Sequence, residues 1–170
     1  MLLADDLIQA KDEGECLQQM VKKFQEVKTS IVAVEEIDLK DSFKYGVVGF
    51  NQSFSGFSKI NAIIEKPSLE YAPSRFGVVG RYVLTPRIFA SLEHLSPGAN
   101  REIQLTDAIA ALLSQEAVYA LKFLGKRYDC GTKLGYLQAI VAYGLRHPEV
   151  AKEFQKYINA SALDEEHAYC

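Results

Sequence analysis

Residues 16–35 read CLQQMVKKFQEVKTSIVAVE, and this stretch decides the fold class. In its first part, apolar residues such as Met20 and Phe24 recur at helical spacing, with lysines and glutamines between them. In its last part, residues 30–35 form a short β-branched run that is typical of a buried strand. The apolar residues 1–4 indicate the end of another buried strand. The order strand, helix, strand is typical of a parallel crossover unit, so the sequence predicts an α/β fold.

Working outward from this stretch, the middle of the chain favours an antiparallel hairpin. Residues 45–50 and 59–65 are strand-like, and the segment 51–57 between them is rich in Ser, Gly and Asn. Two more strands are predicted, at 76–84 and 118–124. Helices are predicted from Thr85-Pro86 onward and over 104–114, 132–145 and 149–158. We expect a polar loop at 125–131 and a disordered tail at 159–170, rich in Ala and acidic residues.

Composition limits the classes of protein to which the chain can belong. Its 170 residues are enough for one domain, with 48% hydrophobic residues and a net charge of -3. A slightly acidic balance argues against a nucleic-acid partner, and the absence of a long apolar run argues against a membrane partner. The start of the chain lacks the basic residues of a signal peptide. Three widely spaced cysteines form no metal pattern and fit free thiols in the cytoplasm.

Carboxylates at predicted strand ends are the first candidates for chemistry. Asp5 and Asp6 follow the opening strand, and Asp129 lies between a predicted strand and a helix. Ligands of open α/β sheets bind beyond the carboxyl ends of strands, where carboxylates can hold Mg²⁺ together with substrate oxygens. The alternative is structural, since aspartate is also common in turns and at helix N-termini.

A second candidate is Glu65-Lys66-Pro67 at the end of the second hairpin strand. A carboxylate there can accept hydrogen bonds from sugar hydroxyls, and an ammonium group can bind a phosphate. The alternative is an ordinary solvated strand end. Neither the Gly-rich dinucleotide motif nor the P-loop motif occurs, and no histidine pairs with a Ser or Cys in a way typical of a triad hydrolase.

Taken in order, these motifs resemble the bacterial UTP–glucose-1-phosphate uridylyltransferases of the sugar-phosphate nucleotidyltransferase superfamily. The matching stretches are LLADDL (2–7), YGVV (45–48), IEKP (64–67), APS (72–74), VGRYVL (79–84), EIQLTDA (102–108), GKRYDCG (125–131) and KLGY (133–136). Each motif alone is weakly specific, but all of them in register are a strong signal.

The resemblance implies a Rossmann-like nucleotidyltransferase fold with a mixed, mostly parallel sheet and an antiparallel hairpin. It implies that UTP and glucose 1-phosphate are converted to UDP-glucose and pyrophosphate, with Mg²⁺ as the cofactor. By position, Asp5 and Asp129 resemble the metal-binding aspartates, which with Lys66 make up the catalytic set. Glu65 resembles the residue that accepts sugar hydroxyls, Lys66 also resembles the phosphate-binding lysine, and Gly46 resembles the glycine against the glucose.

The sequence departs from the family pattern at its start. The family begins with a nucleotide-binding half that carries a Gly-rich loop, and this sequence contains no such loop. Residues 1–158 are therefore expected to be the C-terminal part of a nucleotidyltransferase domain, without the N-terminal nucleotide-binding half, and with an exposed apolar sheet edge. Two hypotheses remain. One is part of an enzyme, active as a homo-oligomer or when paired with the other half. The other is a non-catalytic module that binds sugar phosphate or oligomerises through residues such as Leu137 and Ile140.

Overall fold

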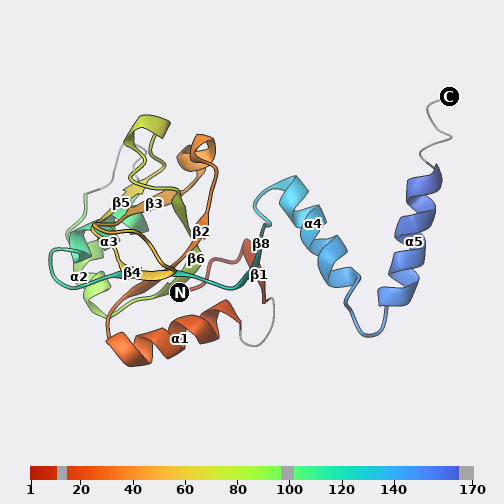
Figure 1. Ribbon diagram of the computed structural model, residues 1–170, viewed down its shortest axis with the longest axis horizontal. Helices are drawn as coiled ribbons and strands as arrows, with labels where there is room; N and C mark the ends of the chain where they lie inside the picture. Colours follow the sequence, from red (N-terminus) through yellow and green to blue (C-terminus); the bar gives the residue numbers. More distant parts are fainter. Residues whose placement is uncertain (11–14, 97–101, 165–170) are drawn as a thin grey trace. The chain divides into compact units, whose positions relative to one another are not determined.

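The computed structural model describes residues 1–10, 15–96 and 102–164. The elements in chain order are β1 (Asp6–Ala10), α1 (Cys16–Val27), β2 (Ile31–Glu36), the 3-10 helix η1 (Leu39–Lys44), β3 (Gly46–Gly49), β4 (Phe57–Lys59), β5 (Ala62–Glu65), the 3-10 helix η2 (Leu69–Tyr71), β6 (Phe76–Val83), α2 (Arg87–Glu93), α3 (Leu105–Leu112), β7 (Tyr119–Lys122), β8 (Gly125–Asp129), α4 (Lys133–Gly144) and α5 (Ala151–Asp164) (Figure 1). The chain divides into two compact units. The first comprises Met1–Ala4 and Ile8–Lys126, and the second comprises Asp5–Leu7 and the chain from Arg127 onward.

A six-stranded sheet forms the centre of the first unit, in the order β4-β7-β2-β6-β3-β5. The predicted mixed α/β fold is confirmed, but the expectation of a mostly parallel sheet is wrong for the strands described here. Only β2 and β7 pair in parallel, and the other pairs are antiparallel. The strand β6 and the hairpin strands β3 and β5 account for most of the antiparallel pairs: β2 with β6, β6 with β3, and β3 with β5.

The two edge strands of this sheet, β4 and β5, follow one another directly in the chain. The predicted strand 59–65 contains β5 and only the last residue of β4, and these two strands lie at opposite ends of the strand order. Only Ile60 and Asn61 separate them. The Ile60 amide donates to the Val118 carbonyl oxygen (2.9 Å) and the Asn61 amide donates to the Gly49 carbonyl oxygen (3.0 Å). These bonds hold the two linking residues against the segment that leads into β7 and against β3.

Both faces of the sheet are covered, which explains the unbroken apolar run of residues 31–34 at the start of β2. Ile31 and Ala33 pack with Met20 of α1, whereas Val32 and Val34 pack with residues of α2 and α3. Successive strand residues point to opposite faces, so a strand covered on both faces must be apolar at each position. Figure 1 shows α1 on a different side of the sheet from α2 and α3. The predicted helix over 16–27 coincides with α1.

A buried carboxylate joins three segments of the first unit. The helix predicted from Thr85-Pro86 onward is α2, which starts after Pro86 without a side-chain cap. The Thr85 hydroxyl instead donates to Glu116 Oε2 (2.9 Å), and the Ser30 hydroxyl donates to Glu116 Oε1 (2.6 Å). The Glu116 side chain is only 10% exposed, so these donors replace the water that burial removes.

The start of the chain and the segment after β7 differ from the predictions. Residues 1–4 were expected to end a buried strand, but Met1 and Leu2 are each 54% exposed, and the strand β1 begins only at Asp6. Leu2 forms an isolated antiparallel bridge with Arg81. The predicted polar loop 125–131 contains the strand β8, which pairs with β1 in a two-stranded sheet. The strand β8 (GKRYD) is mostly polar and β1 (DLIQA) has no strict alternation, so apolar periodicity does not reveal this pair.

Helices α4 and α5 belong to the second unit. Residues on α4 that were suggested as an association surface are exposed: Leu137 (58%), Ile140 (42%), Val141 (37%) and Tyr143 (42%). The ring of Phe154 on α5 lies against Gly144, where an added Cβ would be 2.6 Å from its Cε1 atom. The predicted last helix ended at residue 158, whereas α5 continues to Asp164. The remaining residues of the predicted tail, 165–170, lie outside the described residues. Within the described ranges, no helix is long and apolar enough to cross a membrane.

Candidate functional site

The hairpin of β3 and β5 positions the first group of candidate residues. Gly46 is directly opposite Glu65 in the antiparallel register. The Thr106 hydroxyl on α3 donates to Glu65 Oε2 at 2.9 Å. The Lys66 ammonium is 3.8 Å from Glu65 Oε1, and its side chain is 61% exposed. The hairpin therefore brings together Gly46, Glu65 and Lys66, the residues that the family resemblance assigned to the sugar phosphate.

The turn after β5 is fixed on both sides of Lys66. The Lys66 backbone has a φ of 45°, which side-chain-bearing residues rarely adopt and which costs about 1–2 kcal/mol. Its amide donates to the Tyr45 carbonyl oxygen (2.8 Å), and the buried Ser42 hydroxyl donates to the Pro67 carbonyl oxygen (2.9 Å). These bonds hold a strained turn, and strained turns occur often at functional sites.

A small cavity lies beside this turn. It has a volume of about 180 Å³ and is lined by Met1, Leu3, Glu65, Tyr82, Gln104, Leu105 and Thr106. A carboxylate, a hydroxyl and an amide among apolar side chains are typical of a site that orients a small hydroxylated ligand. Thr106 is the residue that our sequence interpretation missed. It lies within the motif EIQLTDA, but the motif alone does not indicate which side chain it contacts.

The second group of candidates, Asp5 and Asp129, meets around Gly131 in the second unit. An added Cβ at Gly131 would be 3.1 Å from Asp5 Oδ2 and 3.1 Å from Asp129 Oδ1. The Cys130 amide donates to the Asp5 carbonyl oxygen (2.7 Å), and the Gly131 amide donates to Asp129 Oδ1 (3.1 Å). The two predicted metal ligands are therefore neighbours in space, although more than a hundred residues separate them in sequence.

The neighbouring polar residues have structural roles. Asp6 is buried and forms an ion pair with Arg127, so of the adjacent pair Asp5-Asp6 only Asp5 faces Asp129 across Gly131. The alternative that Asp129 caps the next helix is wrong, because Thr132 is the N-cap of α4 and its Oγ1 accepts the Gly135 amide (3.1 Å).

The Asp5 and Asp129 carboxylates fit the needs of Mg²⁺. Mg²⁺ is usually held by one or two carboxylates and completes its shell with water and substrate oxygens. The space at Gly131, which a Cβ would fill, lies close to one oxygen of each carboxylate. Among the described residues no cluster of three or more His, Cys, Asp or Glu side chains occurs, so a site of protein ligands alone is not found there.

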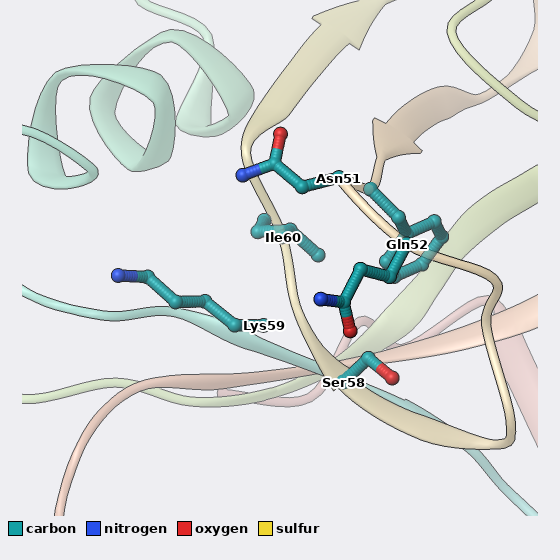
Figure 2. A pocket seen from close by; sticks show the side chains of 6 residues that line it. Asn51, Gln52, Ser58, Lys59 and Ile60 are labelled. Atoms are coloured by element: carbon teal, nitrogen blue, oxygen red, sulfur yellow. The ribbon is translucent and has the colours of Figure 1, made fainter.

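A larger cavity of about 300 Å³ lies away from all of these residues. Figure 2 shows the side chains of Asn51, Gln52, Ser58, Lys59 and Ile60 that line it, together with Phe50. The Asn51 side-chain oxygen already accepts from Asn61 (2.5 Å). None of the predicted site residues contributes to this cavity.

Comparison with known proteins agrees with the fold and with the order of the motifs. The nucleotidyl transferase family profile matches residues 1–145, so the chain belongs to this family. Curated relatives include the UTP–glucose-1-phosphate uridylyltransferases of Staphylococcus epidermidis, 37% identical over 158 residues, and of Haemophilus influenzae, 41% identical over 161 residues. Each alignment covers 93% of this chain but 54% of the relative.

The comparison with solved structures also finds UDP-glucose pyrophosphorylases. The chain is similar to a UDP-glucose pyrophosphorylase complexed with UDP-glucose, with a TM-score of 0.79 and 44% identity over 84% of this chain and 54% of the other. It is also similar to the UTP-bound enzyme from Acinetobacter baumannii, with a TM-score of 0.82 and 38% identity over 92% and 54% of the two chains. The predicted resemblance is confirmed, and the chain spans about half the length of the relatives it matches.

Proposed function

We propose that this chain is the sugar-phosphate-binding and metal-binding part of a UTP–glucose-1-phosphate uridylyltransferase. The reaction joins glucose 1-phosphate to the uridylyl group of UTP and releases pyrophosphate, giving UDP-glucose. The observation that carries the proposal is the fixed pair Glu65-Lys66, which presents a carboxylate and an exposed ammonium at one hairpin end. The names of the relatives and of the similar structures support the choice of substrates.

In this proposal the hairpin end binds glucose 1-phosphate. The Glu65 carboxylate accepts hydrogen bonds from sugar hydroxyls, and the Lys66 ammonium binds the phosphate. The backbone of Gly46 lies against the sugar. The cavity of about 180 Å³ beside Glu65 supports this assignment, since its lining combines polar groups with apolar walls.

Asp5 and Asp129 are proposed to hold Mg²⁺. When bound, the ion neutralises phosphate charge, which would otherwise keep two polyanionic substrates apart. A phosphate oxygen of glucose 1-phosphate is already ionised, so it attacks the α-phosphorus of UTP without a strong general base. The bond from that phosphorus to pyrophosphate then breaks. The protein residues act by positioning and by charge stabilisation, and Lys66 supplies a cation for this purpose.

A second candidate function is a non-catalytic module that binds sugar phosphate or associates with another chain. The observation in its favour is the exposed apolar row on α4, which includes Leu137 and Ile140. The partner in this case is a second copy of the chain or the N-terminal half of a uridylyltransferase. For either function we propose a cytoplasmic location, which the free thiols of Cys16 and Cys130 support.

Pyrophosphate release separates the two functions. The purified chain is mixed with UTP, glucose 1-phosphate and Mg²⁺, with and without the separately produced N-terminal half of a relative. Release by the chain alone, or only with the added half, supports a catalytic role. No release in either case, from a chain shown to be folded by circular dichroism, contradicts the catalytic role and favours the module.

A further inference from the structure

The Glu65 carboxylate has a different neighbour on each of its two oxygens. Oε2 accepts the Thr106 hydroxyl at 2.9 Å, whereas Oε1 is 3.8 Å from the exposed Lys66 ammonium. An ionised carboxylate can accept hydrogen bonds but cannot donate them, so the Thr106 hydroxyl is the donor in this bond. Oε2 is therefore held by the protein, and Oε1 is turned toward the group proposed to bind phosphate.

The methyl group of Thr106 also restricts this side chain. Its methyl carbon Cγ2 would be 2.6 Å from an added Cβ at Gly46, so the glycine leaves just enough room for the methyl. The residue is 7% exposed and lies in the first turn of α3. A β-branched side chain has few χ1 choices in a helix, and contact at the methyl restricts them further. Packing against Gly46 therefore restricts the Thr106 side chain, while the hydroxyl itself bonds to Glu65.

We propose that Thr106 is a positioning residue that fixes the Glu65 carboxylate, so that Oε1 meets a sugar hydroxyl while Lys66 binds the phosphate of the same ligand. This inference deepens the proposed function and rests on it for the identity of the ligand. The division of labour between Glu65 and Lys66 gives the site a chemical preference: a hydroxylated phosphate ester engages both groups, whereas inorganic phosphate engages only Lys66.

Two substitutions of Thr106 separate the hydroxyl from the methyl. Thr106→Val keeps the methyl contact with Gly46 and removes the donor, whereas Thr106→Ser keeps the donor. Isothermal titration calorimetry of the full chain measures the binding of glucose 1-phosphate and of inorganic phosphate. We expect Thr106→Val to weaken glucose 1-phosphate binding by roughly tenfold or more and to leave phosphate binding unchanged. Thr106→Ser restores glucose 1-phosphate binding to within about twofold, the rescue that a hydroxyl role requires.

A crystal structure of Thr106→Val tests the positioning role without any ligand. We expect the Glu65 carboxylate to leave its present position in Thr106→Val and to keep it in Thr106→Ser. A carboxylate that stays in place in the valine variant overturns the proposal, as does a serine variant that binds as weakly as the valine variant. If the valine variant does not fold, Thr106→Ala replaces it in both measurements.

The same experiments distinguish a failure of the proposed function. If the unaltered chain does not bind glucose 1-phosphate at all, the sugar-phosphate assignment fails. The positions of the Glu65 carboxylate in the two crystal structures still decide whether Thr106 positions it.

Discussion

Adding one methyl group at Gly46 should destabilise the chain through a clash with a single side chain. In Gly46→Ala the new Cβ would be 2.6 Å from Thr106 Cγ2 and 3.2 Å from Glu65 Oε2. The first distance is far below van der Waals contact, so either Thr106 or the strand β3 must move. Movement of Thr106 also disturbs the hydrogen bond of its hydroxyl to Glu65.

The expected cost follows from the packing around this position. Forcing an extra methyl into a packed core costs about 1–3 kcal/mol. For a chain of this length a loss of about 2 kcal/mol lowers the melting temperature by roughly 4–8 °C. Thr106→Ser removes the clashing methyl, since the next atom of residue 106, Cβ, would be 3.9 Å from the alanine Cβ. The serine change alone costs about 1 kcal/mol through the lost buried methyl.

The assay is urea unfolding of four proteins: the unaltered chain, Gly46→Ala, Thr106→Ser and the double variant. If the clash is the cause, the double variant is about as stable as Thr106→Ser alone, which is a coupling of about 2 kcal/mol. Additive losses within about 0.5 kcal/mol would refute the reasoning, because the cost of the alanine would then lie elsewhere. A Gly46→Ala variant that is as stable to urea as the unaltered chain would refute the close packing of Gly46 against Thr106.

Three further predictions concern the metal, the phosphate and a buried thiol. Asp129→Asn should abolish Mg²⁺-dependent pyrophosphate release by the chain supplemented with the N-terminal half of a relative, because one of two ligand charges is lost; near-normal turnover would contradict the metal role. Lys66→Ala should weaken glucose 1-phosphate binding at least about tenfold, and UTP binding less, as measured by calorimetry; equal losses would count against the phosphate role. Burial raises the pKa of the Cys16 thiol from 9.0 to about 11, so the fold favours the protonated thiol. Its contribution to the free energy of unfolding is therefore constant below about pH 9 and declines between about pH 9 and pH 11, measured by urea unfolding; this part of the decline should be absent in Cys16→Ala and retained in the control Cys130→Ala.

The parts of the fold that depend on local patterns could be predicted from the sequence. The helix α1 has apolar residues at helical spacing, and the strands β2 and β6 contain short, largely apolar runs, so their type and their burial are visible in the residue order. The strand β8 could not be found in this way. Its residues Gly125–Asp129 are mostly polar, and they become a strand by pairing with β1, which is more than a hundred residues earlier. Pairing between segments so far apart in the sequence leaves no periodic signal in either of them.

The candidate site likewise contains residues that the sequence could predict and one contact that it could not. Glu65 and Lys66 were found because a proline fixes the turn that follows them and because the surrounding motif resembles a known family. The contact of Thr106 with Glu65 joins positions 41 apart. This contact depends on how α3 packs against the hairpin of β3 and β5. The spacing of residues within one segment cannot predict such packing.

The parallel pairing of β2 with β7 has a consequence for the synthesis of this protein. Ile31 pairs with Tyr119, so about ninety further residues must leave the ribosome before β2 obtains that neighbour. At a translation rate of about 5–20 residues per second, this takes roughly 4–18 s. Throughout that interval the nascent chain displays an apolar strand whose final partner does not yet exist. During that interval the edge of β2 that later pairs with β7 stays unpaired and is open to a chaperone.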